Sequence, residues 1–134
     1  IRADREKKPL GLLMLDIDYF KKINDSYGHL NGDIVLKTIG DQLRRFVRGM
    51  DTVFRYGGEE FLLVMPGIAL GNIINRAEEL RAQIAGLKIP VSLETSISIT
   101  VSMGISIYPT SNFGIYEVHK SEHAAQVSRG KSNS

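Results

Sequence analysis

Residues 51–66 constrain the fold of this 134-residue chain more than any other stretch, because they read as two strands joined by a tight turn. The runs DTVFRY and FLLVMP are rich in β-branched and aromatic residues, and they flank Gly57-Gly58-Glu59-Glu60. Paired glycines tolerate the positive φ angles that a tight hairpin demands. The stretch therefore predicts a β-hairpin with two adjacent acids at its tip.

Apolar patterning predicts three further strands. The unbroken apolar run over 9–18 is typical of a short strand buried on both faces. Strict alternation over 97–109 predicts a strand with one buried face, and residues 89–95 predict a weaker strand before it. Strands interspersed with helices favour an α/β fold, in which a mixed, mostly antiparallel sheet is flanked by helices on one or both faces.

Helical spacing accounts for most of the remaining chain. Apolar residues three and four apart predict a short helix over 19–28, and a longer helix with Asn31 as its N-cap and Gly49 as its stop. A third helix is predicted from Ala69 to Ala85, and a short helical segment near 122–129. The final residues, about 130–134, are expected to be mobile.

Length and composition restrict the classes of function. A chain of 134 residues forms one domain with its own core. The absence of cysteine excludes disulfides and thiolate metal sites, so carboxylates become the metal ligands to consider. A formal net charge of +2 is too small to predict nucleic-acid or membrane affinity, and Asp16 interrupts the longest apolar run. The charged opening, residues 1–8, reads as the end of a helix that begins in a longer protein.

Acidic residues gather where the first strand ends. Asp16 and Asp18 are two positions apart and point to the same face while strand geometry holds, so they repel unless a cation joins them. Capping of the next helix is the alternative, and the spacing alone does not decide. A bend at the hairpin brings Glu59 and Glu60 towards this strand end. Mg²⁺ takes one or two such carboxylates and completes its shell with water and phosphate.

Three motifs together carry a resemblance to a known family. LDIDYFKKINDSYGHLNGD (15–33), RGMD (48–51) and RYGGEEF (55–61) resemble the GGDEF family of diguanylate cyclases, here spelled Gly-Gly-Glu-Glu-Phe. The match runs in order from Pro9 to Met65. Members of this family condense two GTP molecules into cyclic di-GMP and release pyrophosphate, with one GTP held by each of two facing domains. The resemblance implies a fold similar to nucleotidyl cyclases and polymerase palms, a homodimer, and Mg²⁺ or Mn²⁺ as cofactor.

The resemblance also assigns the metal and catalytic residues. It implies that Asp16 and Glu59 are metal carboxylates and that the backbone carbonyl of Ile17 is a further ligand. Glu60 is implied as a ligand of a second metal or as the group that assists deprotonation of the attacking 3′-hydroxyl. Asp16, Glu59 and Glu60 are therefore the expected catalytic residues. Two cations suit phosphoryl transfer because they stabilise the attacking and the leaving oxygens.

Substrate contacts follow from the same resemblance. Asn24 and Asp33 match the guanine-reading positions, where a carboxylate suits the N1–H and N2 donors that adenine lacks. The remaining expected contacts, all on the phosphate side, are Phe20, Lys21, Gly57, Gly58 and Arg129. Structural alternatives stay open from the residues alone: Asp33 also suits the first turn of a helix, Asn24 a helix surface, and Phe20 the core.

Arg48 and Asp51 match the RxxD inhibitory site of the family, where product dimers bind. An arginine suits a guanine edge and phosphate as a bidentate donor. The alternative is purely local, because an arginine in the last turn of a helix complements the dipole and an aspartate suits a turn. Family spacing favours product inhibition.

The leading hypothesis is a product-inhibited diguanylate cyclase domain spanning 1–134. The closing family pattern, with its phosphate-binding Lys and Arg, is replaced here by residues 121–129. A catalytically weak or inactive module that binds GTP or cyclic di-GMP for regulation is therefore the alternative, and a cyclase or transferase acting on another nucleotide is a third. The resemblance implies a bacterial, cytoplasmic output domain, and the cytoplasmic part of a membrane-anchored sensor is one form that such a domain takes. It also implies an upstream sensory or receiver domain in the full-length protein, and no nucleic-acid partner.

Overall fold

The computed structural model describes residues 8–108, 115–119 and 126–130, and side chains within 8–108. The first half of the chain holds β1 (Leu10–Ile17), α2 (Phe20–Tyr27), α3 (His29–Phe46), β2 (Thr52–Arg55) and β3 (Glu60–Pro66). The second half holds α4 (Leu70–Ala85), β4 (Ile89–Pro90), β5 (Ser96–Ile97), β6 (Val101–Tyr108), β7 (Ile115–His119) and β8 (Gln126–Gly130).

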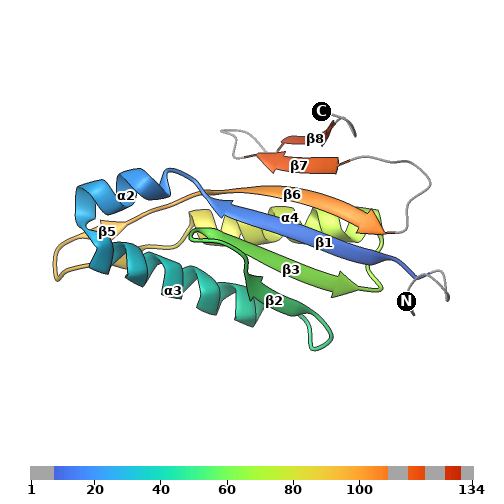
Figure 1. Ribbon diagram of the computed structural model, residues 1–134, viewed down its shortest axis with the longest axis horizontal. Helices are drawn as coiled ribbons and strands as arrows, with labels where there is room; N and C mark the ends of the chain where they lie inside the picture. The colour runs from blue at the N-terminus through green and yellow to red at the C-terminus, as the bar shows by residue number, and fades with distance from the viewer. Residues whose placement is uncertain (1–7, 109–114, 120–125, 131–134) are drawn as a thin grey trace.

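The main sheet has the strand order β2-β3-β1-β6-β7-β8 (Figure 1). Each of these neighbouring pairs is antiparallel, and β4 and β5 form a separate antiparallel pair. The predicted fold class, α/β with a mostly antiparallel sheet and helices, is confirmed, with no parallel pair among the described strands. β2 and β3 form the predicted hairpin, in which Arg55 pairs with Phe61.

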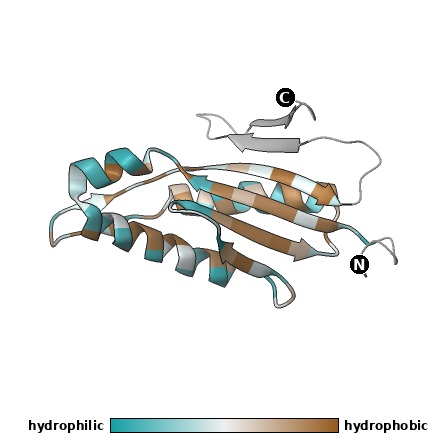
Figure 2. Ribbon diagram, viewed as in Figure 1, coloured by the Kyte–Doolittle hydropathy of each residue, from teal (hydrophilic) through white to brown (hydrophobic). Residues whose placement is uncertain are grey.

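One hydrophobic core joins the sheet to the helices. On β1 the side chains of Leu13, Leu15 and Ile17 are at most 1% exposed, whereas those of the intervening residues are partly exposed. The same alternation holds on β3 and over most of β6. The prediction that the first strand is buried on both faces is therefore wrong, because the buried residues of α3 and α4 join one cluster with a single face of these strands. Figure 2 shows the apolar character that runs along β1 and β3.

Gly11 lets α4 and the residues before it approach β1 closely. A Cβ placed on Gly11 would lie 2.5 Å from a methyl carbon of Ile68 and 2.7 Å from one of Ile73, the latter on α4. The predicted third helix is confirmed as α4, which follows Ala69 and ends before Gly86. Along the described part of the chain, none of the helices has both the length and the apolar character that a membrane crossing requires.

The boundaries of α3 differ from the prediction at both ends. The helix begins at His29, after Gly28 with φ 90°, and ends at Phe46 before Val47. Asn31 is not the N-cap, since it lies inside the helix and its Nδ2 donates to the Tyr27 carbonyl at 2.8 Å. The positive φ of Gly28 turns the chain from α2 directly into α3, which leaves no room for a loop before Asn31.

The C-terminal strands depart most from expectation. Residues 97–109 do not form one strand, because β5 ends at Ile97 and β6 starts at Val101, and residues 89–95 supply only the short β4. The helix predicted near 122–129 is wrong over 126–129, which lie on β8, and residues 122–125 fall outside the described residues. Pairing of β8 with β7 supplies a ladder of backbone bonds that local helix propensity does not offset. Of the end expected to be mobile, about 130–134, Gly130 is the last residue of β8, and residues 131–134 lie outside the described residues, as do the opening residues 1–7.

Candidate active site

Sheet register brings the acids of β1 and the hairpin together. Asp16 lies directly opposite Glu60 in the β1–β3 pair. One residue further along, the Ile17 N–H donates to the Glu59 carbonyl at 3.2 Å. Asp16, Ile17, Glu59 and Glu60, which are distant in sequence, therefore share one end of the sheet.

The prediction that the hairpin glycines adopt positive φ angles is wrong. Neither Gly57 nor Gly58 has a positive φ, which in the described residues occurs only at Tyr19, Gly28 and Gly67. Five residues separate the paired Arg55 and Phe61, and such longer hairpin loops do not need a mirror-image turn. A Cβ on Gly57 would lie 2.8 Å from Glu60 Oε1, so a side chain there would displace the Glu60 carboxylate. Gly58 leaves open space above the turn.

Arg55 holds this turn from the side, a role that the sequence did not suggest. Its Nη2 donates to the Gly58 carbonyl at 2.7 Å and its Nε to the Gly57 carbonyl at 3.3 Å. The Tyr56 and Gly57 N–H groups both donate to the Glu60 carbonyl, at 2.8 and 3.3 Å. The only sequence signal was a cation two residues before a double glycine. With these bonds in place the turn presents Glu59 and Glu60 in a fixed backbone conformation.

Burial and neighbouring acids perturb Asp16. Burial, followed by the neighbouring Glu59 and then the charge of Asp18, raises the pKa of Asp16, while a hydrogen bond with Glu60 opposes this. The Asp16 Oδ1 atom is buried and accepts no hydrogen bond. A divalent cation would relieve both effects, since it supplies positive charge and a bond to an oxygen. Within the described residues no three acids or histidines form a ready ligand cage, so a cation here needs backbone or substrate oxygens as well.

The two hollows beside the hairpin open on opposite faces of β3. Asp16 and Glu60 line a hollow of about 350 Å³ with Met14, Ser102 and Gly104 among its walls. Asp33, Arg55 and Phe61 line a cleft of about 440 Å³ between α3 and the hairpin. Glu60 and Phe61 are adjacent on β3 and so point to opposite faces. Two of the expected catalytic acids, Asp16 and Glu60, therefore line a different hollow from the expected guanine-reading Asp33, and Glu59 lines neither of the two.

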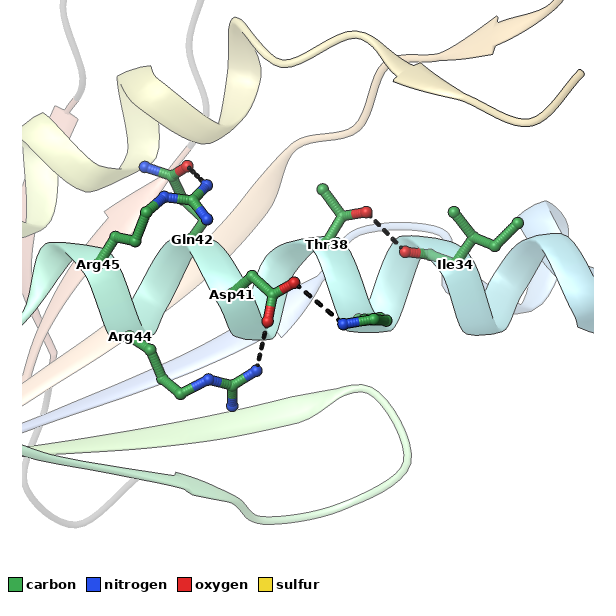
Figure 3. Close-up of polar contacts among 7 residues, drawn as sticks. Ile34, Thr38, Asp41, Gln42, Arg44 and Arg45 are labelled. Atoms are coloured by element: carbon green, nitrogen blue, oxygen red, sulfur yellow. Dashed lines mark hydrogen bonds and ion pairs between the residues drawn. The ribbon is translucent and has the colours of Figure 1, made fainter. Parts of the chain in front are cut away.

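Polar contacts along α3 organise one wall of the cleft. Asp41 accepts hydrogen bonds from Arg44 at 2.6 Å and from Lys37 at 3.3 Å, and these bonds, the one from Arg44 first, lower the pKa of Asp41. Figure 3 shows Arg44 extending from α3 towards the hairpin, with its guanidinium bonded to Asp41. Lys37 and Arg44 both line the cleft. This wall is therefore held in place by pairing within α3.

Asn24 lies where α2 meets α3. A Cβ on Gly32 would collide with the Asn24 side-chain oxygen, so the Asn24 carboxamide lies against Gly32. Gly32 is the residue that precedes Asp33. Asn24 does not line the cleft that contains Asp33. Phe20 is buried in the core at 8% exposure, and Lys21 is exposed and pairs with Asp25 at 3.2 Å. Arg129 lies on β8, and its side chain falls outside the described part of the chain.

Arg48 and Asp51 contact each other closely. The fully buried side chain of Asp51 accepts from the Arg48 backbone N–H at 2.9 Å and from Arg48 Nη2 and Nε at 3.1 and 3.3 Å. Arg48 also lines a hollow of about 310 Å³ with Asn72, Asn75 and Arg76. Arg76, which the sequence did not single out, lies 4.0 Å over the Phe46 ring and donates to the Phe46 carbonyl. The fold thus places two arginines at one hollow.

Comparisons with known proteins agree on one family. A family model described as "Diguanylate cyclase, GGDEF domain" matches residues 1–129. The response regulator PleD of Caulobacter vibrioides is 41% identical over 106 residues, which are 78% of this chain and 23% of PleD. The chain spans about a quarter of the length of such curated relatives.

Two solved structures have the same fold. The active GGEEF domain of a diguanylate cyclase from Vibrio cholerae is 31% identical with a TM-score of 0.75, over 83% of this chain and 69% of that one. The GGDEF domain of DgcB from Caulobacter crescentus, solved with c-di-GMP, is 31% identical with a TM-score of 0.74, over 79% of this chain and 63% of that one.

Proposed function

This chain belongs to the GGDEF family of diguanylate cyclase domains, and from that premise we propose that it condenses two GTP molecules into cyclic di-GMP. The observation that carries the proposal is the register of β1 against β3, which sets Asp16 opposite Glu60 and Ile17 against Glu59. The reaction requires acidic side chains beside the phosphates of a nucleotide, and this end of the sheet offers three of them.

A divalent cation, Mg²⁺ or Mn²⁺, fits the site because of the unpartnered Asp16 oxygen and the raised pKa of the same carboxyl. Asp16, Glu59 and the Ile17 carbonyl would hold it, and Glu60 would hold a second ion or accept the proton of the 3′-hydroxyl. When bound, the cation neutralises phosphate charge and stabilises the developing charge of phosphoryl transfer.

The chain's own residues bind and orient the nucleotide. Asn24 and Asp33 read the guanine edge, and Lys21, at the start of α2, contacts the phosphates. α2 begins here at Phe20, and the N-terminus of a helix favours an anion such as a phosphate. Phe20 contributes by packing beneath this turn. Gly57 and Gly58 let the phosphates approach the backbone, and Arg129 is the proposed further phosphate contact.

The reaction joins two nucleotides, so two copies of the domain must face each other with one GTP each. We propose a homodimer as the active species, with an upstream domain in the full-length protein controlling how often two copies meet. The direct test is incubation with GTP and Mg²⁺ or Mn²⁺, with the dimer checked by light scattering. Absence of cyclic di-GMP from a dimeric sample would refute the proposal.

Guanine selectivity depends on the proposed readers. Asn24→Ala and Asp33→Ala should each lower kcat/KM for GTP by about 10- to 100-fold, since each removes hydrogen bonds to the base. Asp33→Ala should also narrow the preference for GTP over ATP. Glu94→Ala, which removes an exposed acid near β5, is the matched control and should leave both values unchanged. Unaltered selectivity in both reader variants would show that the guanine assignment is wrong.

We also propose that the hollow at Arg48 is an RxxD inhibitory site that binds the product. Support comes from the two arginines at one hollow, and from Asp51, which fixes the Arg48 guanidinium through two side-chain bonds. The similar DgcB domain was solved with c-di-GMP. The same hollow supports the second candidate function, a regulatory module that binds cyclic di-GMP without turnover. Tight product binding in a dimer that makes no product would favour that module.

Removal of the Arg48 fork should relieve product inhibition. In Arg48→Lys the charge beside Asp51 remains, but the bidentate contact is lost, so the inhibitory concentration of cyclic di-GMP should rise about 10-fold. Arg45→Lys is the control, because Arg45 is exposed on α3 and bonds to Gln42. Initial rates measured with added product give the comparison. Equal inhibition of both variants would place the inhibitory site elsewhere.

A further inference from the structure

Asp18, which follows the last residue of β1, binds Ser102 on β6 and Thr100, the residue before β6, through its side chain. Its Oδ2 accepts from the Thr100 hydroxyl and its Oδ1 from the Ser102 hydroxyl, each at 2.6 Å. Its backbone N–H donates to the Thr100 carbonyl at 2.9 Å. These three bonds continue the β1–β6 pairing beyond its last pair, Ile17 with Val101.

The two aspartates of the Asp16-Ile17-Asp18 step therefore have different surroundings. Both oxygens of Asp18 accept short hydrogen bonds from hydroxyl groups, whereas Asp16 Oδ1 accepts none. Short bonds to a carboxylate are charge-assisted and strong. Asp18 thus uses its charge on contacts inside the protein, and Asp16 has an oxygen left for a ligand.

A strained corner follows directly after Asp18. The next residue, Tyr19, has φ 59° and ψ 32°, a left-handed conformation that disfavours side chains with a Cβ. Such conformations persist only where the surroundings hold them. α2 starts immediately afterwards, and its Ile23 N–H donates to the Tyr19 carbonyl at 3.0 Å. The direction of α2, which carries Lys21 and Asn24, is therefore set at this corner.

We propose that Asp18 is a positioning residue: acting through Thr100 and Ser102, it fixes the β1–α2 corner so that Lys21 and Asn24 meet the nucleotide. This inference rests on the proposed function for its consequence in nucleotide binding. Asp18 itself contacts neither the cation nor the nucleotide. In this role the hydrogen bonds of Asp18 to Thr100 and Ser102 determine nucleotide affinity, and its negative charge does not bind the cation.

Three changes separate positioning from metal ligation. Asp18→Asn keeps the size of the side chain and can accept from one hydroxyl and donate to the other, so affinity for a non-hydrolysable GTP analogue should stay within about 3-fold of wild type. Asp18→Ala removes both bonds and should weaken that affinity about 10-fold. Thr100→Val with Ser102→Ala removes the donors and should match Asp18→Ala, and combining all three should add little. Ser106→Ala, the same change on the same strand, is the control.

Calorimetry with the analogue measures affinity, and titration of Mg²⁺ measures metal dependence. The half-saturating Mg²⁺ concentration should stay within about 3-fold of wild type in Asp18→Asn, because the charge of Asp18 acts on Asp16 only through space. If Asp18→Asn instead equals Asp18→Ala and both need more Mg²⁺, Asp18 is a metal ligand and the proposal fails. It also fails if Asp18→Ala and the double variant both bind the analogue as wild type does.

Hydrogen exchange distinguishes failure of this inference from failure of the proposed function. Asp18→Ala and the double variant should exchange the Ile23 amide about 10-fold faster than wild type, with α4 unchanged, because only α2 loses its anchor. Wild-type protein that binds no guanine nucleotide would refute the proposed function, while the exchange rates would still test the corner. Unchanged exchange at α2 would overturn the positioning role.

Discussion

Glu59→Gln should reduce the rate of cyclic di-GMP formation by at least about 100-fold while the domain stays folded. The substitution keeps the shape of the side chain and removes one negative charge from the group formed by Asp16, Glu59 and Glu60. Folding should survive because the Glu59 backbone carbonyl, which accepts from the Ile17 N–H on β1, is not altered by the substitution. Single-turnover assays with saturating GTP and Mg²⁺ measure the loss.

Glu94→Gln is the matched control for this change, because it makes the same substitution in an exposed turn. Its rate should equal that of wild type. Thermal unfolding of both variants verifies the fold. Wild-type turnover in Glu59→Gln would show that the hairpin acid has no part in the chemistry.

Asp16→Asn should produce two opposite effects, a loss of turnover of at least about 100-fold and a gain in stability without metal. The pKa of Asp16 is raised above 3.8 in the folded protein by burial and by Glu59 and Asp18. A raised carboxyl pKa means that ionisation costs the folded state more than the unfolded state. The cost is absent below pH 3.8, where both states are protonated, and complete above the folded pKa. The neutral asparagine does not incur it.

The melting temperature of Asp16→Asn in metal-free buffer should therefore exceed that of wild type at pH 7.5, by about 2–4 °C, and the difference should shrink as the pH falls towards 4. Mg²⁺ with a GTP analogue should reverse the order, since only wild type gains from binding. Differential scanning fluorimetry at several pH values tests both statements. A variant less stable than wild type in metal-free buffer would contradict the proposed crowding of charge.

The sequence predicted those parts of the fold that local pattern determines. The hairpin and α4 are correct because alternation and helical spacing specify them within a few residues. β8 was predicted as helix because its partner β7 lies outside the local window, and strand pairing decided the outcome. The first strand appeared buried on both faces because leucines occur on both. The sequence does not show that the helices pack against only one face.

The sequence identified the residues of the candidate site better than it predicted the contacts between them. The resemblance supplied the acids, and the register of β1 against β3 brings them together. No sequence pattern indicated that Arg55 holds the turn, that Arg76 shares a hollow with Arg48, or that Asp18 binds Thr100. Each of these contacts depends on the packed tertiary structure, and the last two also join residues far apart in the chain. Paired glycines suggested a positive φ, but the observed turn is long enough to avoid it.

The hairpin turn ties the two faces of β2 to those of β3, so its length is critical. β3 pairs with β1 along its whole length, so a single residue inserted or deleted between Arg55 and Phe61 shifts β2 by one position against β3 unless a bulge absorbs it. Such a slip would turn β2 over, and Val53 and Arg55 would leave the cleft that they line with Asp33. Replacement of a turn residue alters one contact, whereas a change in residue number exchanges the two surfaces of the strand.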